Sequence, residues 1–283
     1  MSKWQPLQIV EKISTLPTLP TTVSAVLKEM ANPDSSAIGL AKLISSDQSL
    51  AGGILRVVNS AYYNFPRKIG SLTDAIVLLG YKGIRSIVLS VTAFRFFSNS
   101  SDYIDRKKLW NHALACALIS DLLNRKLNVA ESNAFEAGLL HDIGKVVFDY
   151  LDPELFREAI KEAKRKELPL VSIEPSHFGT DHSEVGTLLA NHWNLPENIV
   201  QAIRFHHQPE KSVPEYLPGT CLVALSNAIT YSLEMGDSVS DAVPELPPIV
   251  FETLKIEETF IEDSREEIRQ SVEIGLEAFS SIN

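Results

Sequence analysis

The stretch Gly138-Leu139-Leu140-His141-Asp142-Ile143-Gly144-Lys145 decides how this chain is interpreted. It places a histidine directly before an aspartate within a run of apolar and small residues that has helical spacing. A neutral imidazole nitrogen next to a carboxylate that can bridge two cations is a donor pair typical of divalent metal sites. The pair therefore predicts a metal site built around His141 and Asp142.

Four more histidines lie on the inward faces of other predicted helices. They are His112, His182, His206 and His207. A buried imidazole without partners loses hydrogen bonds, at a cost of roughly 1–3 kcal/mol for each unsatisfied group. A shared metal satisfies several imidazoles at once, so we expect these side chains to converge on the His141-Asp142 pair.

The adjacent histidines His206 and His207 raise a question of geometry. Neighbouring residues on a helix diverge by about 100°, because the helix has 3.6 residues per turn. We therefore expect this pair to serve two ions, or one ion and a substrate, rather than to clamp one ion. Two other histidines are interpreted as non-ligands: His177, in a predicted loop, and His192, near a predicted helix end.

Apolar residues recur at three- and four-residue spacing along the whole chain, which predicts an all-α fold. Breakers divide the first part into short helices, and longer helices follow. We expect an N-terminal helical subdomain in residues 1–100, a metal-binding helical subdomain in 101–240 and an acidic helical extension in 241–283.

Composition limits the classes of function. The chain has 283 residues, 45% of them hydrophobic, and two cysteines, Cys116 and Cys221, that form no disulfide framework, so we expect a cytoplasmic protein. Nothing approaches the roughly 18 consecutive apolar residues of a membrane span. The net charge is −10, but most of it falls in residues 241–283. The near-neutral remainder is compatible with a phosphorylated small molecule, and the lack of a basic stripe predicts no nucleic-acid binding.

The segment 138–145 resembles the signature of the HD superfamily of metal-dependent phosphohydrolases. Its wider form resembles the HDOD family of bacterial signalling domains, over roughly residues 10 to 230. The matching segments are Leu16-Pro17-Thr18-Leu19-Pro20, Leu55-Arg56-Val57-Val58-Asn59-Ser60-Ala61-Tyr62, Ala75-Ile76-Val77-Leu78-Leu79-Gly80, Asp181-His182-Ser183-Glu184-Val185-Gly186 and Ile203-Arg204-Phe205-His206-His207. The resemblance implies an HD-like helical bundle with an N-terminal helical subdomain.

Similarity to the related HD-GYP phosphodiesterases implies a dinuclear site. Its ligands would be His112, His141, Asp142, His182, His206 and His207. In that likeness Asp142 bridges the ions and Lys145 lies near the substrate phosphate. The chain departs from the pattern twice. Gln208-Pro209-Glu210-Lys211 replaces the Gly-Tyr-Pro loop, and Asn227 stands where the superfamily has its last aspartate.

An amide at position 227 keeps the shape of a carboxylate but removes a negative charge, which lowers affinity for a hard divalent ion. Two functions therefore remain open. The first is a signalling module with a divalent-metal site that responds to a signalling protein or a phosphorylated small molecule. The second is a metal-dependent phosphohydrolase acting on a nucleotide or cyclic dinucleotide, with Asp142 and Lys145 as catalytic residues. Iron, manganese, zinc and nickel all suit the donors, as one ion or two.

Overall fold

A computed structural model of the chain describes residues 8–9, 11–12, 19–97, 104–129, 133–239 and 243–280. Every regular element in these ranges is a helix, so the all-α prediction is confirmed. The chain forms two compact units. One, here called the histidine unit, takes in Met1–Leu16 and Phe97–Arg269, and the other, here called the companion unit, takes in Pro17–Phe96 and Gln270–Asn283. The boundaries predicted at 100/101 and 240/241 lie outside the described residues.

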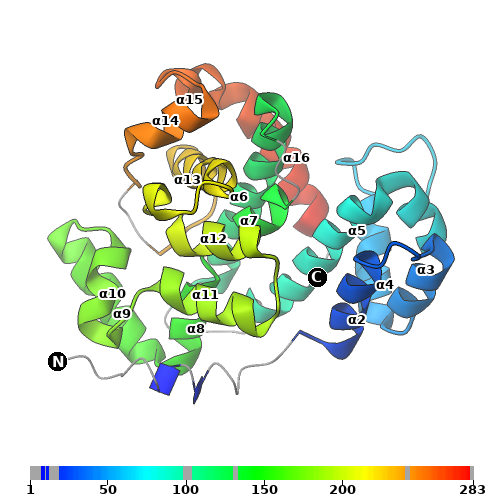
Figure 1. The fold of residues 1–283 in the computed structure, drawn as a ribbon, viewed down its shortest axis with the longest axis horizontal. Coiled ribbons are helices and arrows are strands. Elements are labelled where there is room, and N and C mark those ends of the chain that lie inside the picture. The colour runs from blue at the N-terminus through cyan, green and yellow to red at the C-terminus, as the bar shows by residue number, and fades with distance from the viewer. Residues whose placement is uncertain are drawn as a thin grey trace. The chain divides into compact units, whose positions relative to one another are not determined.

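The histidine unit carries all the predicted ligands, and its helices α6 to α15 are labelled in Figure 1. Its helices are α6 (Arg106–Leu127), α7 (Ala134–Leu140), α8 (Ile143–Leu151), α9 (Pro153–Lys166), α10 (Leu170–Phe178), α11 (His182–His192), α12 (Glu197–Phe205), η1 (Pro209–Lys211), α13 (Leu217–Ser232), α14 (Pro248–Leu254) and α15 (Phe260–Asp263). In this unit α6 packs against α7 and α13, and α11 packs against α8 and α12. These contacts bring together helices that are far apart in sequence.

The local sequence of helix α6 determines where the helix begins and ends and which face is buried. Asp105 caps its first turn by accepting hydrogen bonds from the backbone N–H groups of Lys107 and Lys108, each at 3.1 Å. The helix ends at Asn128, which adopts the left-handed conformation at φ 51°. Its middle is buried over several turns, including His112 and Cys116 on one face. The face that meets α7 therefore carries a ligand into the core.

Two glycines allow helices to approach closely beside the predicted site. A Cβ atom on Gly138 would lie 2.9 Å from the carbonyl oxygen of Cys116, and one on Gly144 would lie 1.9 Å from the carbonyl oxygen of His182. Any larger side chain at either position would force the backbones apart. Gly138 thus fixes the packing of α7 on α6, and Gly144 fixes the packing of α8 on α11.

The companion unit is built from α2 (Thr21–Met30), α3 (Ala37–Ser45), α4 (Gln48–Val58), α5 (Leu72–Phe97) and the last turns of α16 (Arg265–Ser280). Ser71 accepts a hydrogen bond from the backbone N–H of Asp74 at 3.0 Å and so caps α5. Gly80 interrupts the same helix with φ 68° and ψ 175°. The Asn59 side chain exchanges hydrogen bonds of 2.7 and 3.0 Å with the backbone of Ile69, and so ties the end of α4 to the following loop.

Helix α5 is long and apolar enough to cross a membrane by length and composition alone. However, 56% of its most apolar window is buried inside the protein, and its backbone is broken at Gly80. A core helix has these properties as well.

His177 does not lie in a loop, because α10 continues to Phe178 despite Pro175. A proline inside a helix removes one backbone hydrogen bond and crowds the carbonyl four residues earlier, so it favours a helix end; α10 nevertheless continues past it. Of the motif at residues 16–20, Leu16, Pro17 and Thr18 lie outside the described residues.

Candidate metal centre

His141 and Asp142 occupy the turn between two helices. Helix α7 ends at Leu140 and α8 begins at Ile143, with Asp142 at φ −102° and ψ 11°. Because the helix is interrupted here, the two side chains do not diverge as they would on a continuous helix. Nε2 of His141 lies 3.3 Å from Oδ2 of Asp142, and both residues are fully buried. The signature residues therefore present their donor atoms to one point.

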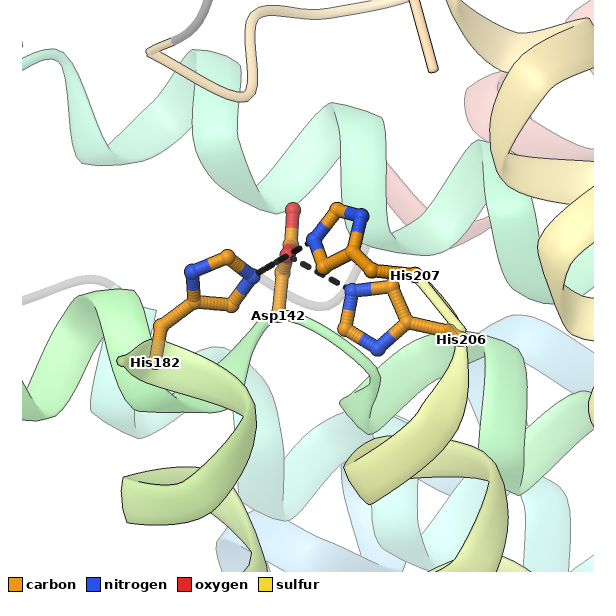
Figure 2. Close-up of side chains that lie close together, drawn as sticks. All are labelled: Asp142, His182, His206 and His207. Atoms are coloured by element: carbon orange, nitrogen blue, oxygen red, sulfur yellow. Dashed lines mark hydrogen bonds and ion pairs between the residues drawn. The ribbon is translucent and has the colours of Figure 1, made fainter. Parts of the chain in front are cut away.

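Asp142 belongs to two sets of donors. The first, here called the three-histidine group, consists of Asp142, His182, His206 and His207, whose donor atoms all lie within 4.8 Å of one another. Figure 2 shows the three imidazoles directed toward the carboxylate. Oδ1 of Asp142 lies 3.3 Å from Nε2 of His182 and 3.7 Å from Nε2 of His206. Nε2 of His207 lies 3.0 Å from Nε2 of His182.

The second set, here called the two-histidine group, consists of His112, His141 and Asp142, with donor atoms within the same 4.8 Å limit. Nε2 of His112 lies 3.7 Å from Oδ2 of Asp142 and 3.0 Å from Oδ1 of Asn227. Helix α13 therefore places the amide where it can reach the same space as this group. The structure brings all seven residues of the predicted ligand set together.

The expectation that His206 and His207 diverge is wrong. Their ring centroids lie 4.0 Å apart, and both belong to the three-histidine group. The angle of about 100° holds only for residues within a helix. Helix α12 ends at Phe205, so His206 is its C-cap and His207 follows in a turn.

Three of the imidazoles are oriented by a contact at Nδ1, the ring nitrogen that does not face Asp142. Nδ1 of His141 donates to the carbonyl oxygen of Gly138 at 2.7 Å, and Nδ1 of His206 donates to that of Ile203 at 2.8 Å. Nδ1 of His182 lies 2.7 Å from a carboxylate oxygen of Glu174. Each ring therefore turns Nε2 toward Asp142, which is the arrangement that orients histidine ligands around a metal.

The cluster fits a divalent ion by its unsatisfied atoms as well as by its chemistry. Within the described residues, Nε2 of His141, Nε2 of His206 and Oδ1 of Asp142 are buried and have no hydrogen-bond partner. Unpaired buried polar atoms are costly, and a cation bound between them would satisfy all three. Imidazole nitrogens with a carboxylate suit zinc, iron, nickel or manganese.

Burial keeps part of the cluster neutral. It lowers the pKa of His112 to about 3, even though the Asp142 carboxylate acts in the opposite direction. It also lowers the pKa of His206 and of His207 well below the usual range, and neighbouring imidazoles add to the effect. These three side chains are therefore uncharged at neutral pH and hold a lone pair that a cation can accept.

Charged neighbours override burial elsewhere. Burial opposes a charge on His182, but the Glu174 carboxylate raises its pKa to about 9. Burial also disfavours ionised Asp142, yet Lys145 and His141 hold the pKa of this carboxyl well below its usual range. Asp142 is thus a carboxylate at neutral pH, and a cation bound at His182 would displace its proton.

Lys145 is buried, with 2% of its surface exposed, and its Nζ donates to Oδ2 of Asp142 at 2.7 Å. Lys145 is therefore not a solvated surface side chain. The position lies three residues after Asp142 in the first turn of α8, so the two side chains share one helix face. The ammonium group stays next to the cluster and within reach of an anion bound there.

Glu174 was missed in the sequence. It is fully buried on α10, and one carboxylate oxygen receives both the backbone N–H of His182 at 2.9 Å and contact with the ring nitrogen. A carboxylate behind a histidine ligand is a recurring feature of metal sites. Its signal in the sequence was a lone glutamate within an apolar stretch beside Pro175, in a segment interpreted partly as loop.

A cavity of about 490 Å³ adjoins the three-histidine group. Its wall includes His182, His207 and Lys145, together with Tyr231 and the first turn of α10. Pockets for small ligands typically span roughly 300–1,000 Å³. The cluster is therefore accessible to a small molecule from the side of the three-histidine group.

A family model described as HDOD domain matches residues 16–209, which is more than half of the chain. The chain belongs to the HDOD domain family. The HDOD match covers all the clustered residues except Asn227.

Two curated proteins similar to this HDOD chain are longer than it. One, an uncharacterised protein of Treponema pallidum (strain Nichols), is 29% identical over 238 residues, which cover 83% of this chain and 46% of that protein. The other, a ribonuclease Y of Geobacter metallireducens, is 27% identical over 227 residues, which cover 79% of this chain and 35% of that protein. The HDOD chain spans less than half the length of these curated relatives.

A solved structure supports the architecture. The crystal structure of an HDOD domain protein of unknown function from Geobacter sulfurreducens matches with a TM-score of 0.79 at 26% sequence identity. The match covers 94% of this chain and 97% of that one. The predicted HDOD helical architecture is confirmed.

Proposed function

We propose that this HDOD protein is a signalling module that binds one or two divalent metal ions and, beside them, a phosphorylated small molecule. The observation that carries the proposal is the pair of donor groups that share Asp142, one of which lines a cavity together with Lys145. A carboxylate between two sets of imidazoles is suited to bridge two cations. The cavity gives a ligand access to them.

Different residues of the chain would bind the ions, orient a ligand histidine and contact the phosphate. The imidazoles and Asp142 would hold the ions, and Glu174 would keep His182 in the orientation that binds. A bound divalent ion would acidify a water molecule and neutralise phosphate charge. Lys145 would place a positive charge beside the phosphate, at a position where little water competes for it.

Asn227 favours signalling over efficient turnover. Its amide oxygen faces His112 where a carboxylate would add a full negative charge. A site with one carboxylate fewer binds a hard cation more weakly and acidifies water differently. The two-histidine group would therefore hold a metal ion in only part of the molecules. The protein would then still bind a phosphorylated ligand but would hydrolyse it slowly.

Hydrolysis of a phosphoester, such as a nucleotide or cyclic dinucleotide, is the second candidate. The specific observation in its favour is the complete three-histidine group beside Lys145 and the cavity. One relative, the Geobacter metallireducens protein, is called a ribonuclease and so acts on phosphodiesters of RNA. In this candidate Asp142 and Lys145 would be the catalytic residues.

Elemental analysis and a turnover assay distinguish the two candidates. Metal content is measured on the purified chain, and a generic phosphodiester is then supplied with added manganese, iron or magnesium. Bound metal with binding of inorganic phosphate but no turnover supports the signalling module. Turnover that Asp142→Ala abolishes and Asn227→Asp raises supports the hydrolase. Absence of both metal and turnover contradicts both candidates.

We further propose a cytoplasmic protein that binds neither membranes nor nucleic acid, with a signalling protein as its partner. A short RNA oligonucleotide belongs in the same assay. Cleavage or tight binding of that RNA would contradict the expectation based on the missing basic stripe.

A further inference from the structure

Tyr231 lies where the cavity meets the two-histidine group. Its side chain is part of the cavity wall, and its ring packs edge-on against His112 with 5.1 Å between centroids. It stands on α13 one turn after Asn227, so both side chains share a helix face. The cavity wall thus includes Lys145 and His182 from other helices and a phenol from α13.

The phenol is held in place by a short turn after α13. The Tyr231 hydroxyl is hydrogen-bonded to the hydroxyl of Ser238, which is 2% exposed. That turn is anchored on α6, because the backbone N–H of Asp237 donates to the carbonyl oxygen of Lys108 at 3.1 Å. Gly236, at φ +82°, allows the approach, since a Cβ there would lie 2.3 Å from the backbone nitrogen of His112.

Several polar side chains of the cavity wall are already engaged, whereas the hydroxyl oxygen of Ser183 is buried and has no hydrogen-bond partner among the residues that the structure describes. Arg204 donates to Glu184 at 3.1 and 3.3 Å, and Ser172 donates to the carbonyl oxygen of Pro169 at 2.7 Å. Lys145 uses one of its three hydrogens on Asp142. Lys145 and the phenol are thus two groups of the cavity wall that can donate hydrogen bonds to an anion beside the cluster.

From this geometry we propose that Tyr231 is a ligand-binding residue, whose hydroxyl donates a hydrogen bond to an oxygen of the phosphate bound beside Asp142. The inference rests on the proposed function and adds a specific contact to it. When Ser238 donates its hydrogen to the phenol oxygen, the phenol hydrogen is free to point at the ligand. Hydrogen bonds in such a chain strengthen one another. Lys145 and Tyr231 then contact the phosphate from different helices.

The test is binding of inorganic phosphate to the manganese-loaded full chain, measured by titration calorimetry for wild type and Tyr231→Phe. We expect Tyr231→Phe to weaken phosphate binding about tenfold, because it keeps the ring against His112 and removes only the hydroxyl. Manganese content by elemental analysis should be unchanged. Ser238→Ala should weaken phosphate binding about threefold, since it releases the phenol without removing it.

The matched control is Tyr150→Phe, the same chemical change on a tyrosine of α8 that is 56% exposed and outside the cavity wall. It should bind phosphate like wild type. If Tyr231→Phe binds phosphate as tightly as wild type does, the hydroxyl makes no ligand contact and this inference is overturned while the proposed function stands. If manganese is lost from Tyr231→Phe, the residue acts on the metal rather than on the ligand. If the manganese-loaded wild type binds no phosphate, both the proposed function and this inference are overturned.

Discussion

The two donor groups share one carboxylate but differ in the number of their imidazoles, in their access to the cavity and in the residues beside them. The three-histidine group adds three imidazoles to Asp142, lines the cavity and is braced by Glu174. The two-histidine group adds two imidazoles, and the neutral amide oxygen of Asn227 lies 3.0 Å from Nε2 of His112. A similar number of donor residues therefore does not mean similar affinity. We expect the three-histidine group to bind the first ion and the two-histidine group to bind a second ion more weakly.

Removal of the shared carboxylate charge should have the largest effect on metal binding by the two groups. We expect Asp142→Asn to lose metal from both groups, because each group has only this anionic ligand. Elemental analysis after dialysis measures the loss, and thermal unfolding verifies that the variant folds. Asp121→Asn, on α6 outside both groups, is the control and should retain metal. Full retention of one ion by Asp142→Asn would show that the groups do not depend on a common residue.

Gly144→Ala should destabilise the fold at the contact between α8 and α11. The new methyl group would lie 1.9 Å from the carbonyl oxygen of His182 and so would push α11 away from α8. Overpacking of this kind costs about 3 kcal/mol, which denaturant unfolding can measure. Gly52→Ala is the control, because its methyl group would lie 3.4 Å from the end of the Arg56 side chain. Equal stability of Gly144→Ala and wild type would contradict the close approach of the two helices.

The pair formed by Glu174 and His182 should give the metal-free protein a pH-dependent stability. The pKa of His182 is raised from 6.5 to about 9, so the charged pair stabilises the fold fully below pH 6.5 and less as pH rises through 9. A shift of this size corresponds to about 3 kcal/mol. We expect the unfolding free energies of wild type and Glu174→Gln to differ most at pH 6 and to approach each other at pH 9.5. A difference that is constant across this range would exclude the charged pair as its cause.

The smallest expected effect is an increase in the metal affinity of the two-histidine group. Asn227→Asp should raise the affinity for the second ion about tenfold, equivalent to ~1.4 kcal/mol, because it adds a carboxylate beside His112. Isothermal titration with manganese measures both sites. Asn191→Asp, on an exposed position of α11, adds the same charge elsewhere and should leave the affinity unchanged. An unaltered second affinity in Asn227→Asp would mean that the residue does not face the ion.

The helical class and the convergence of the histidines could be predicted from the sequence because both depend on local signals. Apolar spacing marks helices and their buried faces, and a histidine on such a face needs a partner in the core. Ser71, a serine just before an apolar run, is a local signal of the same kind, and it caps α5. The distances between the histidines depend in addition on how the helices pack, which these local signals do not set.

The remaining features depend on where helices end and which distant residues meet. The contact between the rings of His206 and His207 follows from the end of α12 at Phe205, which spacing alone does not locate. The roles of Glu174 and Tyr231 arise from contacts with residues on other helices. Burial of Lys145 also depends on the surrounding elements, because its helix position fits a surface lysine equally well.

A carboxylate that serves two sites makes their occupancies interdependent. An ion in the three-histidine group would draw electron density from Asp142 and repel a second cation across it, while also fixing the side chain that the second cation needs. By thermodynamic reciprocity, whatever factor the first ion imposes on the second affinity, the second imposes on the first. The pair of sites would therefore respond to metal supply as one cooperative unit, in which the weaker site reports the state of the stronger.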